Sequence, residues 1–475
     1  MTTAPHPNLD ERAARGKAAR ARTALTEHSK WVPTANRPDP VALLEEQNTN
    51  REVDLLAVRH GRMMVSPFTF YRGAAKIMGA DLSGMPVAGL EVQLCGDAHL
   101  SNFGAYASPE RTLVFDLNDF DETLPGPFEY DVKRMAASCM IAGRNNGFSK
   151  SDARDATHAS VQAYRDGISE FARMNTLDIW YARLSENELM HAIEVKTRDL
   201  ERQHTKGAKS ARKMAEKTAR KAHTRDSLQA LSKLAEVVDG RQRIVSQPPI
   251  VVPLRELAPS RGLSVDEMEQ AVHEQFRAYR ATLPDDRRRL LERFEIIDMA
   301  RKVVGVGSVG TRAFIVLLRG RDEHDPLFLQ VKEATKSVLE DHLPKSHYPE
   351  AGERVVQGQR MMQAASDIFL GWTRGVEAGR HLYWRQLRDM KGSALIESMI
   401  PSALAFYGQV CGRTLARAHA RSGDPVALAA YLGKSDKFDR AIVDFSIRYA
   451  DQNERDYETF TDAIRSGRLE ALEGV

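Results

Sequence analysis

Six side chains suited to binding a cation are crowded into one stretch of 26 residues: Asp97, Asn102, Asp116, Asp119, Asp121 and Glu122. Two carboxylates about 4 Å apart repel by roughly 4 kcal/mol at an effective dielectric near 20, so such crowding favours a bound cation. Carboxylate and amide oxygens are hard ligands that Mg²⁺ accepts, usually together with substrate phosphates. The alternative is an acidic turn whose side chains cap the backbone without any ligand.

The segments next to these side chains have the length and composition of short β-strands. Residues 91–94 and 113–117 are such runs, so most of the polar residues fall on the loops that follow them. Loops at the ends of strands are where binding and catalytic residues concentrate. The sequence therefore places a candidate site on the loops after these two strands.

A glycine-rich segment far along the chain offers a second chemical signal. Gly305, Gly307 and Gly310 are followed by an apolar run over residues 313–318. A dinucleotide-binding fingerprint would have to open a helix, whereas this one leads into a strand. A glycine loop between strands is how kinases cover the phosphates of ATP, because glycine lets the backbone approach the phosphate oxygens. A simple flexible hairpin turn is the alternative.

Lys332 closes the next strand candidate, residues 327–331, and lies 22 positions after Gly310. In a sheet folded over a nucleotide, its amine would reach phosphate oxygens. A kinase lysine is oriented by an acidic partner, normally from the following helix. Glu353 is the candidate partner, and Glu350 and Glu340 are alternatives. Glutamates at helix starts also interact with the helix dipole without any such role.

Length and composition limit the class of protein. The chain has 475 residues, a net charge of +3 and three widely spaced cysteines, at positions 95, 139 and 411, that match no metal or redox spacing. The net charge is too small to argue for nucleic acid or membrane binding. A basic run from Lys206 to Arg225 lacks aromatic residues and is typical of a solvated helical face. No stretch has the apolar length of a signal sequence core or a spanning helix, so we expect a cytoplasmic protein.

The pattern along the chain predicts four regions. Residues 1–38 read as a mobile basic arm, and a helix is expected to begin with Asp39 as N-cap and Pro40 as its first residue. Residues 39–300 are mainly helical with short strands, and residues 301–393 form a sheet with one helix. Residues 394–475 are helical and would pack on the 39–300 region. Within the second region, the long helical stretch from about residue 150 to 295 reads as an insert.

The acidic stretch resembles the catalytic segment of aminoglycoside phosphotransferases and related kinase-like enzymes. Those enzymes carry His-Gly-Asp, then Asn after four residues, then a strand and an Asp-Phe/Trp-x-Asp element, and then Asp-Leu at the start of a helix. Asp97 and Asn102 keep the first spacing, and Asp119-Phe120-Asp121 keeps the second. Cys95 stands where the family usually has His, which is a departure from its pattern.

The resemblance implies roles for these residues. Asp97 would orient or deprotonate an acceptor hydroxyl, and Asn102 and Asp119, with Asp121 beside them, would bind Mg²⁺. Asp131 would play the structural role found at the start of the helix after this element. Arg59, Arg62 and Arg72, which are mixed with aromatic residues, could face an anionic ligand or pack against the acidic loops.

The whole chain also resembles a bacterial group, the domain of unknown function 2252 family. The resemblance rests on the segments 96–104, 118–122 and 386–391 and covers roughly residues 40 to 460. It implies membership of the kinase-like fold rather than a particular reaction. In ordinary kinases the glycine loop and lysine come first and the catalytic loop later, whereas the order here is reversed.

We therefore expect an α+β, protein-kinase-like two-lobe fold that is circularly permuted and carries a large helical insert. Permutation is tolerated where the original termini lie close together at the surface. The segment 412–420 resembles the helix that normally leads towards the catalytic loop. Leu387, Arg388 and Asp389 would form the hinge that meets adenine.

The expected function is ATP- and Mg²⁺-dependent phosphoryl transfer to a hydroxyl acceptor that the sequence does not identify. Two alternatives remain: a nucleotide-binding pseudokinase that acts as a regulatory module, and a nucleotidyl transferase that uses the same site. A metal-dependent hydrolase using His99 is a weaker reading. The phosphotransferase, pseudokinase and nucleotidyl transferase hypotheses all require the Lys332 amine to lie within reach of Asp119.

Overall fold

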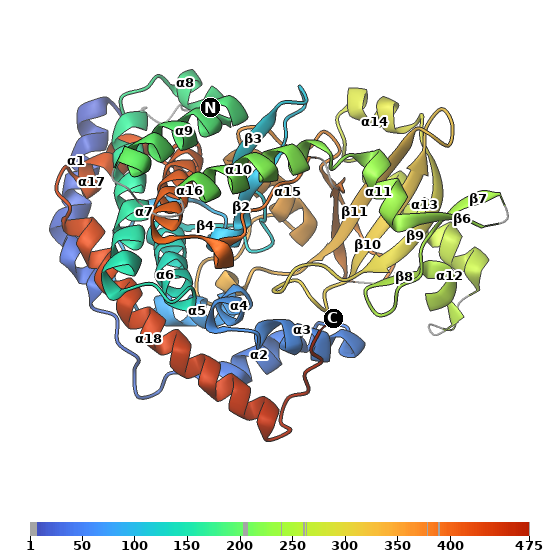
Figure 1. The fold of residues 1–475 in the computed structure, drawn as a ribbon, viewed down its shortest axis with the longest axis horizontal. Coiled ribbons are helices and arrows are strands. Elements are labelled where there is room, and N and C mark those ends of the chain that lie inside the picture. The colour runs from blue at the N-terminus through green and yellow to red at the C-terminus, as the bar shows by residue number, and fades with distance from the viewer. Residues whose placement is uncertain are drawn as a thin grey trace.

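The chain folds into two parts, a helical body and a sheet with its own covering helices, drawn on the left and right of Figure 1. The computed structural model describes residues 7–202, 208–238, 240–259, 262, 264–377, 379–387 and 390–474. The architecture is mixed α+β, with several antiparallel sheets. Segments from both ends of the sequence build the helical body, while the middle of the chain builds the sheet part (Figure 1).

The helical body is organised around α6, whose residues are buried on nearly every face. Helix α7 packs along both α6 and α16, and the long α18 crosses their outer side. This packing buries one large apolar core. The elements are α6 (Glu129–Asn145), α7 (Lys150–Phe171), α8 (Thr176–Tyr181), α16 (Pro401–Ser422), α17 (Pro425–Leu432) and α18 (Lys437–Arg465).

The first 90 residues wrap around this body as short helices. Asp39 caps α2 and Pro40 is its first residue, as predicted, because the Asp39 carboxylate accepts from the Val41 and Ala42 backbone amides. The elements are α1 (Leu9–Arg22), η1 (Leu25–Ser29), α2 (Pro40–Asn48), η2 (Val53–Leu55), α3 (Leu56–Met63), α4 (Pro67–Arg72) and α5 (Ala75–Leu82).

Part of the segment expected to be a mobile arm is packed against the body. Helix α1 lies along α17, and the Arg12 guanidinium is 2.7 Å from the Asp424 carboxylate. Trp31 is only 5% exposed and contacts the rings of Phe445 and Tyr449 on α18. Apolar burial therefore holds residues 9–31 against the body, whereas the prediction of a mobile arm considered only the charge of this segment.

Two small sheets carry the acidic stretch. Strand β1 pairs with β4, and β2 pairs with β3, which in turn pairs with β5; all pairings are antiparallel. A 3-10 turn, η3 (Leu100–Asn102), leads directly into β2. The strands are β1 (Glu91–Leu94), β2 (Phe103–Ala107), β3 (Leu113–Leu117), β4 (Leu124–Pro127) and β5 (Leu184–Ser185).

The second part is a six-stranded antiparallel sheet with the order β12-β13-β11-β10-β9-β8. Its core includes Trp384 of β13, which stacks on Tyr279 of α13 with 4.5 Å between ring centroids. The strands are β8 (Val251–Pro253), β9 (Glu295–Lys302), β10 (Ala313–Arg319), β11 (Pro326–Ala334), β12 (Gly371–Arg374) and β13 (His381–Gln386). Strand β8 and most of β9 precede residue 301, where we placed the start of the sheet.

The remaining elements cover the six-stranded sheet, lie over β2 and β3 of the body, or connect the two parts. The two helices expected over residues 265–294 are present, separated as predicted near Pro284. These elements are α9 (Glu186–Arg202), α10 (Ala208–His223), α11 (Ser227–Leu234), β6 (Ala235–Val238), β7 (Arg241–Ile244), α12 (Leu254–Leu257), α13 (Val265–Arg280), α14 (Asp285–Leu291), η5 (Val338–Asp341), α15 (Ala351–Met362) and η6 (Ile396–Ser398).

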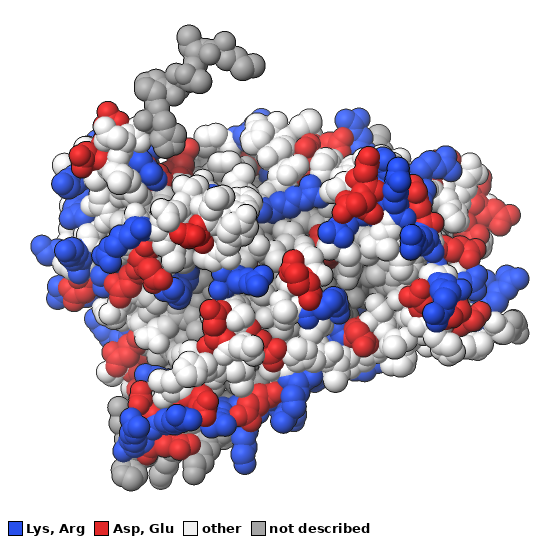
Figure 2. Space-filling model, turned by 90° about the horizontal axis from the view of Figure 1, so that it is seen from above, with Lys and Arg blue, Asp and Glu red and all other residues white. Residues whose placement is uncertain are grey.

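The surface shows no single dominant charge on the face seen in Figure 2. There, Lys and Arg side chains are intermingled with Asp and Glu over both parts of the molecule. This distribution agrees with the small net charge of the sequence. Within the described residues, no helix combines the length and apolar character needed to cross a lipid bilayer.

The side chain of Arg37 ties the N-terminal segment to the body and provides a test of the fold. It donates to Asp81 at 2.7 and 2.8 Å and to Asp456 at 2.8 and 2.6 Å, and it is 11% exposed. Replacing Arg37 with Ala leaves two buried carboxylates without this partner, so we expect a loss of about 3–5 kcal/mol in the free energy of unfolding in urea.

The matched control is Arg440→Ala, which removes an exposed ion pair with Asp436 on the surface of α18. An exposed pair of this spacing contributes about 0.5 kcal/mol or less. Equal unfolding free energies for the Arg37 and Arg440 variants would show that the N-terminal segment does not depend on the buried ion pairs.

Candidate functional site

A cavity of about 370 Å³ lies between the helical body and the sheet part. Both segments singled out in the sequence line it, although they are far apart in the chain. The acidic stretch contributes Asp97, His99, Asn102, Asp119, Asp121 and Glu122, and the glycine-rich segment contributes Gly305, Val306, Gly307, Ser308 and Thr311. The fold therefore brings these two polar segments together around one space.

Lys332 connects the sheet to the acidic loops. Its Nζ lies 2.6 Å from Asp121 Oδ2 and 3.9 Å from Asp119 Oδ1, and its side chain is 3% exposed. In the antiparallel pair of β10 and β11, Lys332 is opposite Ala313, the first residue after the glycine-rich segment. The strand register thus brings Lys332 beside the end of that segment, and its amine lies within reach of Asp119.

The groups around Asp121 stabilise its ionised form and the charged form of Lys332. Burial opposes ionisation of the Asp121 carboxyl, but Lys332 and the Tyr383 hydroxyl lower its pKa to about 2. The hydroxyl donates to Asp121 Oδ1 at 2.6 Å, and Ser308 of the glycine-rich segment donates to Oδ2 at 3.2 Å. Burial alone would lower the pKa of Lys332, whereas Asp119 and Asp121 raise it, so the ammonium stays charged.

Asp97, on the loop that follows β1, occupies a different electrostatic setting. Burial raises the pKa of its carboxyl to about 6, although the Arg134 guanidinium works in the opposite direction. Arg134 Nε donates to Asp97 Oδ1 at 2.7 Å and holds the carboxylate in place. His99 Nε2 lies 3.6 Å from the other oxygen, and burial keeps the pKa of this imidazole well below its usual value. A carboxyl with this pKa can exchange a proton near neutral pH.

The backbone of the Asp97 loop is held by Asp131 in the first turn of α6. The carboxylate accepts hydrogen bonds from the Cys95 amide at 2.8 Å and the Gly96 amide at 3.0 Å. His419 of α16 approaches the same carboxylate at 3.2 Å. This arrangement gives Asp131 the structural position that the sequence resemblance implied, and it anchors the loop to two helices.

The oxygen atoms suited to a divalent cation are those of Asn102 and Asp119. Asp119 Oδ1 is buried and has no hydrogen-bond partner among the described residues. The Asn102 amide nitrogen donates to the Asp97 carbonyl at 2.7 Å, which leaves the amide oxygen to face a cation. Within the described residues, no group of three or more His, Cys, Asp or Glu side chains forms a closed metal site. The donor set fits Mg²⁺, which commonly uses one or two protein ligands together with phosphate oxygens and water.

Two arginines of the N-terminal segment complete the cavity wall. Arg51 packs against Gly310 and donates to the Val309 carbonyl, and its charge interacts with Glu122 and Asp121. Arg72 lines the cavity, and its buried Nε has no partner among the described residues. Sequence reasoning noted Arg72 within an arginine and aromatic cluster but missed Arg51, which carries no recognisable pattern.

Lys391 is a further residue to which the sequence assigned no role. Burial, together with the nearby Arg385, lowers the pKa of its amine to about 7, while Asp119 acts in the opposite direction. It belongs to the segment 386–391 that carried the family resemblance. Its position in this segment was the feature of the sequence that could have pointed to Lys391.

Several residues expected at the site lie elsewhere. Gly310 packs on Arg51 and is outside the cavity lining. Leu387, directly after β13, donates its amide to the Phe328 carbonyl of β11 and is also outside the lining. Glu353 is in the first turn of α15, whereas the described carboxylates within 4 Å of Lys332 Nζ are Asp121 and Asp119. The partner of the lysine is therefore Asp121, supplied by the acidic loop itself. Arg388 and Asp389 lie outside the described residues.

Fold and site together define a two-part α+β protein with a charged cavity between its parts, in which a glycine-rich segment faces a carboxylate cluster. A family model described as an uncharacterized protein conserved in bacteria (DUF2252) matches residues 51–463. The chain belongs to this family. Neither the curated proteins nor the solved structures gave a significant match to the chain.

The close approach of Gly96 to the acidic loop can be tested directly. Its φ is +84°, and a Cβ atom there would lie 2.1 Å from the Glu122 carbonyl oxygen. Replacing Gly96 with Ala must therefore displace one of the two loops, and we expect a loss of about 3 kcal/mol or more in the free energy of unfolding.

Gly147→Ala is the control, because Gly147 has a similar φ of +73° but no atom within 4 Å of the Cβ position. Backbone strain alone costs about 1–2 kcal/mol at such a position. Urea unfolding of both variants separates strain from contact, and equal losses would contradict the close packing of the two loops.

Proposed function

We propose that this protein is an ATP- and Mg²⁺-dependent phosphotransferase with a kinase-like fold in circularly permuted order. The observation that carries the proposal is the contact of Lys332, on the sheet, with Asp119 and Asp121, two carboxylates of the body that line the cavity between the two parts. In kinase-like enzymes a strand lysine, a glycine loop and metal-binding carboxylates surround the same triphosphate. The cavity brings the same residue types together.

The sheet side would hold the nucleotide. Backbone amides near Gly305 and Gly307 can approach phosphate oxygens closely, and the Lys332 ammonium supplies a fixed positive charge. Arg51 and Arg72 also belong to the cavity lining, and guanidinium groups suit phosphate oxygens. Stabilisation of the transferring phosphoryl group by such fixed charges is the main source of rate enhancement in this chemistry.

Asn102 and Asp119 would hold Mg²⁺, with Asp121 as the carboxylate behind them. When bound, the ion neutralises charge on the phosphate oxygens. Asp119 Oδ1 supports this assignment, because it is buried and accepts no hydrogen bond among the described residues. Asp121 would then serve chiefly to orient Lys332, which is the role that a helix glutamate has in ordinary kinases.

Asp97 would receive the acceptor hydroxyl. Its carboxylate lines the cavity and is fixed by Arg134, so it can orient the hydroxyl and accept its proton. The raised pKa of Asp97 suits a general base working near neutral pH.

The contacts of α16 support a permuted chain order. Tyr407 donates to the Leu100 and Phe103 carbonyls at 3.0 and 3.2 Å, and His419 reaches Asp131. Helix α16 follows the sheet part in sequence and packs against the Asp97 loop in space. This is the position of the helix that leads towards the catalytic loop in kinase-like enzymes, although here the loop comes earlier in the chain.

Replacing Asp119 with Asn tests the metal assignment. We expect ATP with MgCl₂ to raise the melting temperature of the wild-type protein, because ligand binding to the folded state stabilises it. The variant should lose the Mg²⁺-dependent part of that shift, and any ATP turnover should fall by about a hundredfold or more. Its own melting temperature should change little, since Asp121 still pairs with Lys332.

Asp286→Asn, an exposed position on α14, serves as the matched control and should behave as wild type. ATP consumption measured against a panel of hydroxyl compounds, with mass spectrometry of the products, distinguishes phosphoryl from adenylyl transfer. Binding of ATP without turnover on any acceptor would favour a pseudokinase. An Asp119→Asn variant with the full Mg²⁺-dependent shift would refute the assignment.

The pH dependence of turnover follows from Asp97. Its carboxyl must be ionised to accept a proton, and burial raises its pKa to about 6. We therefore expect kcat/KM to fall as the pH drops through about 6, with a plateau above. The measurement is the initial rate from about pH 5 to about pH 8 at fixed free Mg²⁺. A profile flat through this range would rule out Asp97 as the base.

A further inference from the structure

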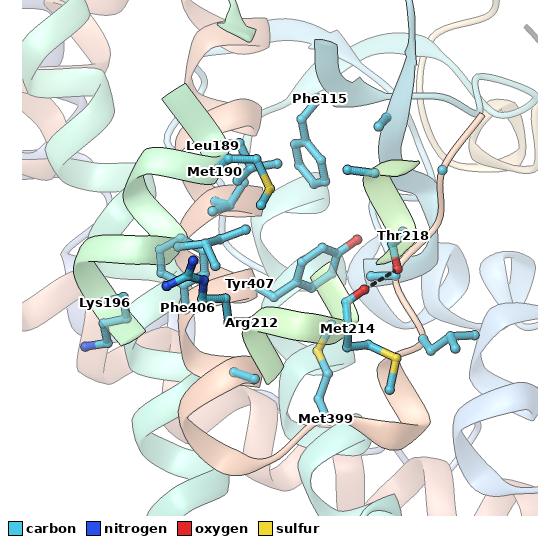
Figure 3. Close-up of a pocket in the computed structure, with 18 of the residues that line it drawn as sticks. Phe115, Leu189, Met190, Lys196, Arg212, Met214, Thr218, Met399, Phe406 and Tyr407 are labelled. Carbon is cyan, nitrogen blue, oxygen red and sulfur yellow. Dashed lines mark hydrogen bonds between the residues drawn. The ribbon is translucent and has the colours of Figure 1, made fainter. Parts of the chain in front are cut away.

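A second cavity, of about 340 Å³, lies within the helical body, and its lining shares no residue with the charged cavity. Helices α9 and α10 cover one side of it, and strands β2 and β3 with the start of α16 form the other, as Figure 3 shows. The chain segment after the sheet, residues 392–400, closes it from below. The cavity is therefore lined by elements from three regions of the sequence.

Its walls are largely apolar and adaptable. Aromatic rings of Phe115, Phe406 and Tyr407 and the thioethers of Met190 and Met214 point into it (Figure 3). Methionine side chains adjust to ligands of different shape. The volume is within the range of small-molecule sites and would hold on the order of ten methylene groups, if each displaces about one water volume of about 30 Å³.

A few polar groups also belong to the lining of this apolar space. The Ser402 hydroxyl is buried and has no hydrogen-bond partner among the described residues. Lys196 of α9 and Arg212 of α10 also belong to the lining; Arg212 is 42% exposed and bonds Glu216 at 2.8 Å. Two cations beside an apolar cavity match a ligand with an aliphatic chain and an anionic end.

We propose that this cavity binds a single-chain amphiphile with an anionic head, such as a medium-chain fatty acid. The chain lies among the methionine and aromatic side chains, and the carboxylate lies between Lys196 and Arg212. The Ser402 hydroxyl then donates to an oxygen of the ligand. This binding does not depend on the proposed phosphoryl transfer.

Tyr407 connects the cavity to the Asp97 loop. Its ring is part of the cavity wall, and its hydroxyl donates to the carbonyls of Leu100 and Phe103, on either side of Asn102. A ligand that packs against the ring restricts the tyrosine and, through these bonds, the backbone that carries Asn102. Occupancy of the apolar cavity therefore rigidifies the loop of the charged cavity.

The experiment measures binding of dodecanoate and of dodecanol to the full chain by isothermal titration calorimetry. We expect saturable binding of dodecanoate at one site. Ala403→Trp fills the cavity from α16 and should weaken this binding at least tenfold, whereas Gln409→Trp, exposed on the same helix, should bind as wild type. Circular dichroism verifies that both variants are folded.

The charge variant Lys196→Gln/Arg212→Gln keeps the apolar wall and provides a second test that does not depend on filling the cavity. It should weaken dodecanoate binding about three- to fivefold and leave dodecanol binding unchanged. Equal losses for both ligands would overturn the anionic-head assignment. Absence of saturable dodecanoate binding to the wild-type protein, or unchanged binding in Ala403→Trp, would overturn the site itself.

Hydrogen exchange tests the connection to the loop. Dodecanoate should slow amide exchange over residues 97–103 in the wild-type protein. Tyr407→Phe should retain ligand binding but lose this protection, because the phenyl ring fills the same space without the hydroxyl. Equal protection in both proteins, or none in the wild type, would overturn the connection through Tyr407.

Discussion

The ion pair between Lys332 and Asp121 is the interaction on which the charged cavity depends. The Lys332 side chain is removed from water, whereas Asp121 faces the cavity and is 27% exposed. A buried charge costs several kcal/mol unless a partner and further hydrogen bonds compensate it. Here Tyr383 and Ser308 supply those bonds to the carboxylate. The pair joins strand β11 of the sheet to the acidic loop of the body, so it also fixes the spacing of the two parts across the cavity. Loss of either partner would leave an uncompensated charge at their junction.

The acidic loops keep their shape because helix α6 holds them by specific polar contacts. Asp131 receives two backbone amides of the Asp97 loop, and Arg134, one turn later on the same helix, pairs with the Asp97 carboxylate. Opposite them, Arg354 of α15 donates to the carbonyls of Asp121 and Thr123. Buried side chains thus form hydrogen bonds to backbone groups of these loops that would otherwise be unpaired. The same contacts hold like-charged carboxylates close together.

The two cavities share a structural border. The backbone from Leu100 to Phe103 carries Asn102 towards the charged cavity, and its carbonyls accept the hydroxyl of Tyr407 from the wall of the apolar cavity. Strands β2 and β3 have the same double function, because they position the acidic residues at their ends and present Phe115 to the apolar side. A single stretch of backbone, residues 100–103, therefore contacts a wall residue of one cavity, Tyr407, and carries a wall residue of the other, Asn102.

Local patterns in the sequence determined the elements and the chemistry of the charged segments. Asp39 and Pro40 mark the start of α2, Pro284 separates α13 from α14, and Lys332 lies on a strand, because capping, turn and strand preferences act over a few residues. The strand continues to Ala334, two residues beyond the lysine that was expected to close it. Tertiary structure alone decided that Asp121, rather than Glu353, pairs with Lys332, and that Arg51 borders the same cavity. It also created the apolar cavity under α9 and α10. These outcomes depend on which distant surfaces pack together, and local residue preferences do not encode that packing.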